Sequence, residues 1–338
     1  GSRSVAVGHG ALYTQEPASA VNMNNTAVGY IAGYAVTTGT NNTFIGGNAG
    51  DSINSGSYNT AVGSAALQTD DVGTHNTALG YASLATQNIA TAAATYNTAV
   101  GANAMYGLTT GTHNTAVGGA ALDATVTGGY NVAVGYGALS TATSGTFQVA
   151  IGASALGLNS TGIHNTAVGY SALYSNVAGD ESVAMGFECL YSQNPSGNVD
   201  MGNTAVGWKA LRSLGTGVGN TAIGRQAGYS QTGFGSTFVG WNAGYSAVGD
   251  TNTCIGYQAG QDTTALTSGS ENVLVGTNVR TSAADSTNQV VIGHDCSGNA
   301  NDSFVIGNGA TDSAIAFGAT SITAPSDIRL KEDIQDEV

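Results

Sequence analysis

A five-residue phrase, Asn-Thr-Ala-Val-Gly, recurs with small variations along almost the whole chain, most often every 17 residues. We take its glycine as the anchor of a repeat unit and count positions from it, so that −1 precedes the anchor and +1 follows it. A period this short predicts small units stacked on their neighbours rather than one globular core. The anchors are Gly8, Gly29, Gly46, Gly63, Gly80, Gly101, Gly118, Gly135, Gly152, Gly169, Gly186, Gly207, Gly224, Gly240, Gly256, Gly276, Gly293 and Gly307.

Each unit contains a short segment typical of a β-strand. Position −1 is Val, Ile, Leu or Met, position −2 is usually Ala, and position −3 is mostly Thr or Val, so the segment is apolar on both faces. Position −4 is mostly Asn, whose side chains can hydrogen-bond along a stack. We expect the residues after the anchor, typically x-x-Ala-Leu, to form a second strand. The sequence therefore predicts an all-β fold, a parallel β-solenoid or β-roll of about 18 coils.

The thin interior of such a coil covers one face of each strand. We expect the other face, with its Ala residues at −2, to pack against other copies of the chain, because small residues allow a second surface to approach closely. A closed cyclic assembly gives every copy the same contacts. We predict a homotrimer, in which the partners of each chain are two further copies of itself.

Composition excludes several classes of partner. The net charge is −14, and no Lys or Arg occurs between Arg3 and Lys209, which argues against nucleic acid and anionic membranes. No apolar run reaches the roughly 18 residues of a membrane span, so no membrane insertion is expected. Cys189, Cys254 and Cys296 stand where other units carry Ala, which predicts small buried apolar side chains. No phosphate-binding loop or other cofactor motif is present, so we expect no cofactor.

Seven consecutive units carry an aromatic ring or a histidine at position −5. Two interpretations stay open: a stacking ladder that stabilises the solenoid, or a π-rich stripe that binds a glycan or another surface. The histidines are two or more coils apart, too far to share an ion, so no metal site is expected. These residues, which we call the −5 column, are Tyr58, His75, Tyr96, His113, Tyr130, Phe147 and His164.

Aromatic rings also follow the anchor directly, at Tyr30, Tyr81, Tyr136, Tyr170, Phe187, Trp208, Trp241 and Tyr257. Rings on a turn suit either sugar stacking or corner packing. We take the last five as further candidates for receptor contacts, beside the −5 column. The acidic residues are scattered and form no repeated pair suited to acid–base chemistry, so we expect no enzyme activity in the repeats.

The repeats resemble the head repeats of trimeric autotransporter adhesins, in which a similar Ser/Asn-Val-Ala-Ile-Gly phrase builds a left-handed parallel β-roll trimer. Residues 4–8 and 182–186 come closest to that phrase, and the likeness covers about 300 residues. The period here is longer than in those heads. The resemblance implies a left-handed coil and a trimer.

The segment 326–334, Ser-Asp-Ile-Arg-Leu-Lys-Glu-Asp-Ile, is similar to the opening of the intramolecular chaperone domain of phage tail fibres and tailspikes. In that family the domain assembles the trimer and then cuts itself off just before this serine. Ser326 and Lys331 match the serine and the lysine of the self-cleavage site, and a lysine near a hydroxyl can serve as its base. The resemblance implies cleavage of the bond between Pro325 and Ser326.

Four segments follow from these features. Residues 1–3 are expected to be a non-native lead-in, 4–309 the repeat shaft, 310–325 a C-terminal cap or junction, and 326–338 the start of the chaperone domain. We expect a structural and receptor-binding segment of a phage tail fibre, extracellular on the virion, whose receptor is a host cell-surface glycan or protein. It is not an enzyme beyond a single self-cleavage. A bacterial trimeric adhesin head and a polysaccharide-degrading tailspike remain as alternatives.

Overall fold

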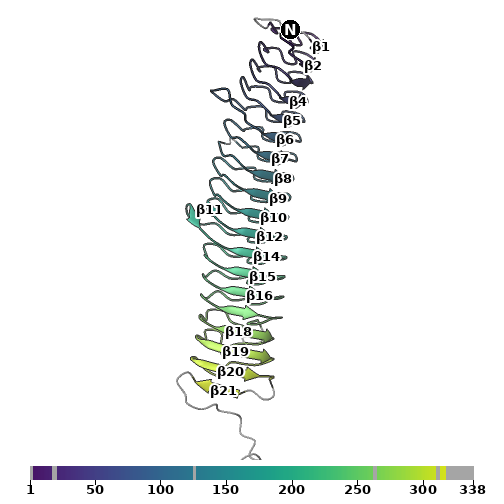
Figure 1. The fold of residues 1–338 in the computed structure, drawn as a ribbon. Helices are drawn as coiled ribbons and strands as arrows, with labels where there is room; N and C mark the ends of the chain where they lie inside the picture. Colours follow the sequence, from purple (N-terminus) through teal and green to yellow (C-terminus); the bar gives the residue numbers. More distant parts are fainter. Residues whose placement is uncertain (1–2, 17–20, 125–126, 262–264, 310–312, 317–338) are drawn as a thin grey trace, which may run out of the picture. The chain divides into compact units, whose positions relative to one another are not determined.

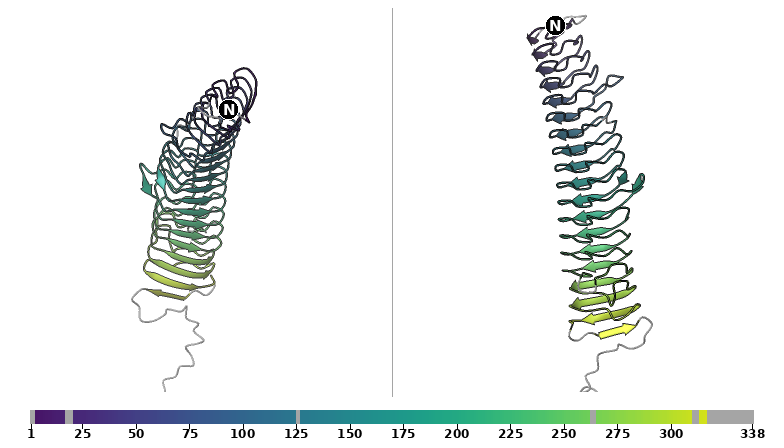
Figure 2. Two further views of the ribbon diagram at one scale, coloured as in Figure 1. Left: turned by 45° about the horizontal axis from the view of Figure 1, so that its top comes forward. Right: turned by 180° about the vertical axis from the view of Figure 1, so that it is seen from behind.

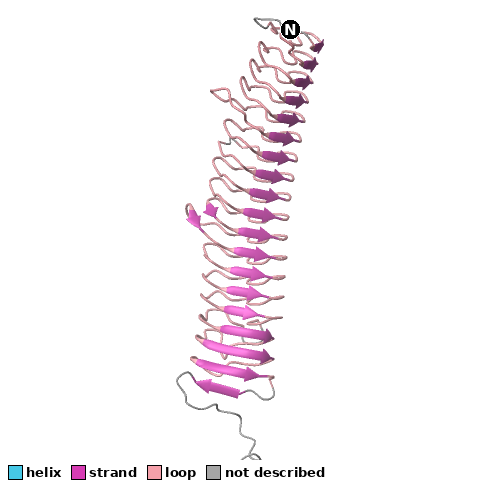
Figure 3. Cartoon of the chain, viewed as in Figure 1, coloured by secondary structure: helices cyan, strands magenta, loops and turns pink. Residues whose placement is uncertain are grey.

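The computed structural model describes residues 3–16, 21–124, 127–261, 265–309 and 313–316. The chain divides into two compact units, residues 1–188 with 194–200, and residues 189–193 with 201–338. Strands and turns make up both units, and no helix occurs among the described residues (Figure 3). The part of the chain that the structure describes thus holds no helix long and apolar enough to cross a membrane.

The first unit is a stack of eleven three-residue strands, which pair in parallel and in register, one strand to a coil (Figure 1). A short parallel pair, β11 (Gly179–Asp180) and β13 (Val199–Asp200), stands beside this stack (Figure 2). The eleven strands are β1 (Val5–Val7), β2 (Thr26–Val28), β3 (Thr43–Ile45), β4 (Thr60–Val62), β5 (Thr77–Leu79), β6 (Thr98–Val100), β7 (Thr115–Val117), β8 (Val132–Val134), β9 (Val149–Ile151), β10 (Thr166–Val168) and β12 (Val183–Met185).

The second unit repeats this architecture with seven parallel strands, and a last strand, β21 (Ser313–Ala316), pairs antiparallel with β20. Each unit is therefore a parallel β-solenoid, which confirms the predicted fold class. The seven strands are β14 (Thr204–Val206), β15 (Thr221–Ile223), β16 (Thr237–Val239), β17 (Thr253–Ile255), β18 (Val273–Thr277), β19 (Gln289–His294) and β20 (Ser303–Gly307).

The prediction of a second strand after each anchor was wrong. After Gly63, residues Ala65 and Leu67 have φ angles of +57° and +50°, which lie in the left-handed region and cannot continue a strand. The adjacent Ala66 and Leu67 are both fully buried, whereas neighbours in a strand point to opposite sides. The segment is a series of turns stacked on the adjacent coils, and the Leu67 N–H donates to the Ser83 carbonyl at 2.9 Å.

The prediction that the Ala residues at −2 face other copies of the chain was also wrong. Ala61 and Ala78 are fully buried inside their own coils. The interior of these coils also holds the side chains at positions +3 and +4, so only a small side chain fits at −2. The outward side chains are those at −3 and −1, such as Thr77, which is half-buried, and Leu79, which is 46% exposed. The uncovered face of the sheet therefore consists of Thr and branched apolar residues.

The predicted Asn ladder is confirmed, and it lies inside the coils. The Asn42 N–H donates to Asn25 Oδ1 at 2.8 Å, and Asn42 Nδ2 donates to the Gly56 carbonyl of the next coil at 2.9 Å. Since Asn42 is buried, these bonds supply partners that water cannot reach. The anchor glycines stack just as closely: Gly63 has a φ of +136°, and a Cβ there would lie 2.4 Å from the Gly80 carbonyl oxygen.

Where one coil has a large side chain in the core, the adjacent positions in the stack have smaller residues. Phe44 replaces Ala at position −2 and is fully buried. Gly33 and Gly50 stand where half of the coils have Leu at +4, and a Cβ on either would lie within 2.7 Å of the Phe44 ring. One large ring thus fills the space of two leucines. The three cysteines are buried and form no disulfide, as predicted.

Candidate functional site

The −5 column is one continuous stack of exposed side chains along the first unit. Centroids of neighbouring rings lie 4.7–5.4 Å apart from Tyr58 to His164. Each of the five inner rings therefore packs against the rings of the coils before and after it, and the two end rings pack against one neighbour. This arrangement leaves ring edges and tyrosine hydroxyls at the surface, while most ring faces are covered by neighbours.

Backbone conformation makes these residues unusual at position −5. Tyr58 and Phe147 have φ angles of +61° and +56°, a region that favours Gly and Asn. Other coils follow that preference at the same position with Asn41 and Gly219. Aromatic rings thus occupy a conformation that disfavours them, and stacking offsets part of the cost. Whether this column also binds a receptor stays a prediction.

Tyr136 at position +1 lies in a different environment. It is 72% exposed, and the same position in the adjacent coils is Gly119 and Ala153. Among the described residues no aromatic ring stacks on it, in contrast to Tyr170 and Phe187, whose centroids lie 5.3 Å apart. The Tyr136 ring therefore presents face as well as edge to the solvent.

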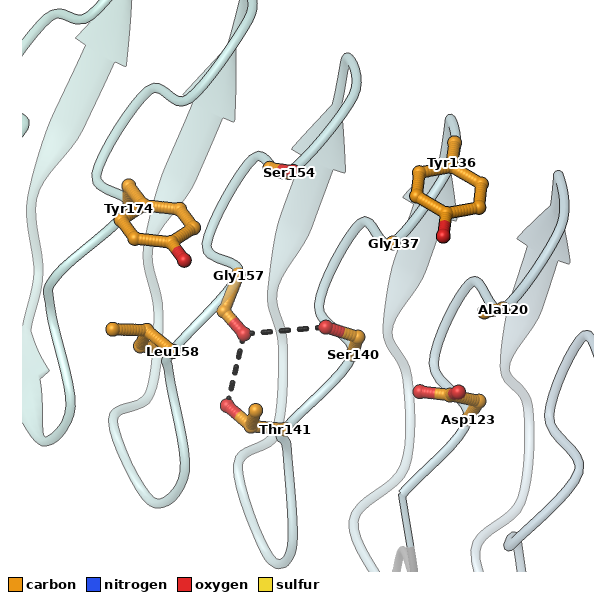
Figure 4. Close-up of a pocket in the computed structure, with 10 residues that line it drawn as sticks. All are labelled: Ala120, Asp123, Tyr136, Gly137, Ser140, Thr141, Ser154, Gly157, Leu158 and Tyr174. Atoms are coloured by element: carbon orange, nitrogen blue, oxygen red, sulfur yellow. Dashed lines mark hydrogen bonds between the residues drawn. The ribbon is translucent and has the colours of Figure 1, made fainter.

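A pocket of about 300 Å³ opens beside this ring. Tyr136 and Tyr174 lie on either side of Ser140 and Gly157 (Figure 4). The Ser140 hydroxyl donates to the Gly157 carbonyl at 3.3 Å, which fixes this part of the floor. The Asp123 carboxyl lines one end, and partial burial raises its pKa above the usual range. The remaining lining residues are Ala120, Gly137, Thr141, Ser154 and Leu158.

The pocket exists because of what stands at position +5 in four successive coils. Asp123, Ser140, Gly157 and Tyr174 occupy this position in turn, and the two small residues in the middle leave space between larger ends. We call the surface formed by positions +1, +2, +5 and +6 the turn face. The interruption of an aromatic column by small residues creates a concave site on it.

Position +5 forms a third aromatic column, which was not predicted from the sequence. Tyr13 and Tyr34 stack at 5.3 Å in the first unit, and Tyr229 and Tyr245 at 4.9 Å in the second. Counting five residues forward from the anchors would have revealed it. None of the twelve candidate receptor residues lines the pocket, although Tyr136 shares position +1 with five of them.

In the second unit, Trp208, Trp241 and Tyr257 lie on the turn face at position +1. The Trp241 and Tyr257 centroids are 4.8 Å apart. Ser326 and Lys331 lie outside the described residues. Within the described residues, no group of three or more His, Cys, Asp or Glu side chains could hold a metal ion.

A scan against protein families gives no match to this chain, and a search of curated proteins gives none either.

Proposed function

We propose that this chain is a structural and receptor-binding segment of a phage tail fibre, which attaches the virion to a host cell through a surface glycan. The observation that carries the proposal is the pocket beside Tyr136. An exposed ring face can stack on a sugar, and the Asp123 carboxyl can accept hydrogen bonds from sugar hydroxyls. Its volume, about 300 Å³, is at the lower end of the range for small-ligand sites.

Binding is favoured over hydrolysis by the polar groups that the pocket offers. Among the described residues that line it, Asp123 alone carries a carboxylate. Glycoside hydrolases use a pair of carboxyl groups on opposite sides of the scissile bond. A polysaccharide-degrading tailspike is therefore the weaker proposal.

Self-association is supported by the outward face of the parallel sheet. Both faces of a parallel sheet are normally covered, yet the side chain at −1 is exposed or half-buried in every coil of the first unit. A recurring apolar surface of this kind marks an interaction site. We propose that two further copies of the chain cover it in a left-handed homotrimer. The exposed apolar residues in the first unit include Val28, Ile45, Leu79, Val117, Ile151 and Met185.

The likeness of residues 326–334 to the start of a self-cleaving chaperone supports a phage fibre over the alternative, a bacterial adhesin head. In a precursor that carries the whole chaperone domain, we expect cleavage between Pro325 and Ser326, with Lys331 as the base for the Ser326 hydroxyl. Mass spectrometry of the mature product locates the cut. An uncut wild-type precursor would favour the adhesin head.

The attachment proposal is tested by binding of fluorescent protein to a panel of bacterial cells. Tyr136→Ala and Tyr174→Ala should each reduce binding about tenfold, as expected for the loss of a stacking contact of about 1.4 kcal/mol. Tyr81→Ala is the matched control, because Tyr81 occupies position +1, is 62% exposed and lies outside the pocket. Equal binding by all these proteins would contradict the pocket as receptor site. A triple variant, with Tyr96, Tyr130 and Phe147 changed to Ala, tests the −5 column in the same assay.

The trimer is tested by light scattering. The wild-type protein should have three times the mass of one chain. Adding Val117→Asp and Ile151→Asp together should dissociate it, since two buried carboxylates would lack partners. Tyr81→Asp introduces one such carboxylate on the turn face and should leave the trimer intact. A monomeric wild-type protein would contradict the proposal.

A further inference from the structure

The turn face of the second unit carries a column in which arginine alternates with aromatic rings. At position +1, four successive coils present Trp208, Arg225, Trp241 and Tyr257. The Arg225 guanidinium carbon lies 4.8 Å from the centroid of Trp208 and 5.6 Å from that of Trp241. Arg225 is exposed and has no ion-pair partner among the described residues.

A second column of the same kind runs along position +5. Here the order is Tyr191, Arg212, Tyr229 and Tyr245. The Arg212 guanidinium carbon lies 5.0 Å from the Tyr191 centroid and 6.0 Å from that of Tyr229. Lys209 at position +2 belongs to the same face, with its Nζ 4.4 Å from the centre of the Trp208 ring.

This clustering of positive charge stands out in so acidic a chain. The sequence has seven Lys and Arg residues against 21 Asp and Glu, and three of the seven, Lys209, Arg212 and Arg225, lie on this face. Positions +1 and +5 of the first unit carry no Lys or Arg at all, and Asp51 and Asp123 stand there instead. Stacking does not require arginine, since the −5 column stacks with rings alone. Ring stacking alone therefore does not account for the positive charge of Arg225.

We propose that this face of the second unit binds an acidic polysaccharide. The Arg225 guanidinium, held between two rings, keeps the N–H groups of its edge available for a carboxylate or a sulfate. The rings beside it offer apolar surface to the sugar. Trp208 and Trp241 are two coils apart, about 10 Å at the usual strand spacing, so both rings can contact one extended polymer.

The same chemistry fits nucleic acid less well. Nucleic acids are bound by many cations along a densely charged backbone, and only three lie here in a protein of net charge −14. The inference rests on the proposed attachment function. It adds that one of the ligands is negatively charged. It concerns residues of the second unit only, whereas the Tyr136 pocket belongs to the first.

The test measures binding of the whole protein to immobilised polysaccharides at low and physiological salt. Polygalacturonate carries carboxylates, dextran sulfate carries sulfates, and dextran carries no charge. The wild-type protein should bind at least one acidic polymer, more weakly as salt rises, and should not bind dextran. A double variant, Arg212→Gln with Arg225→Gln, should lose about tenfold or more in affinity, which is about 1.4 kcal/mol or more, because both charged donors are removed.

The matched control is Arg280→Gln, which removes a positive charge from the same unit at position +4, outside both columns. It should bind acidic polymers within about twofold of wild type, a change below 0.5 kcal/mol. A loss of affinity in the control that is half or more of the loss in the double variant, on a logarithmic scale, would reduce the effect to net charge and overturn the inference. So would a lack of binding to both acidic polymers, or preferential binding of a thymidine oligonucleotide.

Cell attachment separates this inference from the proposed function. Tyr136→Ala should bind acidic polymers as the wild-type protein does, whereas its binding to cells should fall. If wild type attaches to cells through the Tyr136 pocket but binds no acidic polymer, the inference fails and the attachment function stands. If wild type binds acidic polymers but Tyr136→Ala attaches to cells as wild type does, the attachment proposal fails at its pocket and the acidic site stands.

Discussion

The interior columns and the turn-face columns are built on the same coil spacing but differ in how far they vary. Inside, positions −4, −2 and +3 hold Asn, Ala and Ala in most coils, and position +4 holds Leu in half of them. Outside, positions +1 and +5 range from Gly and Ser to Asp, Arg, Tyr and Trp. Water does not reach the interior, so each position there is restricted to residues that fill the space and supply hydrogen-bond partners for buried backbone groups. The turns carry no such constraint, so recognition can evolve there without disturbing the stack.

The largest loss of stability should come from emptying the interior at its largest side chain. Phe44→Ala leaves the space between Gly33 and Gly50 unfilled and should lower the free energy of unfolding by about 3–5 kcal/mol. Chemical denaturation measures this change.

The compensating variant sharpens the test. Adding Gly33→Leu and Gly50→Leu to Phe44→Ala rebuilds the Ala and Leu arrangement of other coils and should recover most of the loss. Leucine tolerates the left-handed backbone there, as Leu67 does at +50°. Gly50→Leu alone should destabilise, because its Cβ would lie 2.3 Å from the Phe44 ring. A stable Gly50→Leu protein would disprove the size compensation.

A smaller interior effect is expected from breaking one step of the Asn ladder. Asn114 Oδ1 accepts from the Asn131 N–H at 3.0 Å, and Asn114 Nδ2 donates to the Gly128 carbonyl at 3.1 Å. Asn114→Ala leaves both backbone groups buried without partners and should cost about 2–4 kcal/mol in the free energy of unfolding.

Glutamine is the matched control at this position. Gln148 occupies −4 two coils further along, where its Oε1 accepts from the Asn165 N–H at 3.1 Å and its Nε2 donates to the Gly162 carbonyl. Asn114→Gln should therefore retain most of the stability that Asn114→Ala loses. Equal losses in both variants would mean that side-chain shape, rather than the hydrogen bonds, holds this step.

The repeat was sufficient to predict the solenoid, because its spacing and its β-branched and Asn positions follow directly from the needs of stacked coils. The wrong prediction about the Ala residues at −2 concerned which side chains point into the coil. Composition alone does not say that Ala61 points inward and Leu79 outward, since both are apolar. The pocket was not predicted because it depends on the small size of Ser140 and Gly157. Small residues at one position form no motif that can be recognised in a sequence. Tyr136 was visible in the sequence, but its open ring face depends on Gly119 and Ala153 one coil away on either side.

One interior residue should make stability depend on pH. Burial raises the pKa of Asp70 to about 6, and its carboxylate accepts hydrogen bonds from the Gly73 N–H and Gln87 Nε2 at 3.1 and 2.7 Å. The unfolded chain loses this proton near the ordinary value of 3.8, so the folded state binds more protons between the two values. Stability should therefore fall as the pH rises from about 4 to 6, by up to about 3 kcal/mol.

Asp70→Asn removes this titration and should flatten the pH profile of unfolding over that range. An amide already occupies the same position, +7, at Asn176, where Oδ1 accepts from the Gly179 N–H at 3.0 Å. Asp285→Asn removes an exposed carboxylate and should keep the wild-type profile. If Asp70→Asn follows the wild-type curve, another group controls the pH dependence.

The smallest effect is expected on the surface, in the −5 column. Tyr130 stacks on His113 and Phe147 with centroid distances of 4.7 and 5.1 Å, but it is 53% exposed. Tyr130→Asn loses both contacts, each about 0.5–1.5 kcal/mol at most, and gains a residue that suits a φ of +61°. The two terms should nearly cancel, so the free energy of unfolding should change by less than about 1 kcal/mol. A loss as large as that of Asn114→Ala would make the column structural, whereas unchanged stability with weaker cell binding would favour its use as a binding stripe.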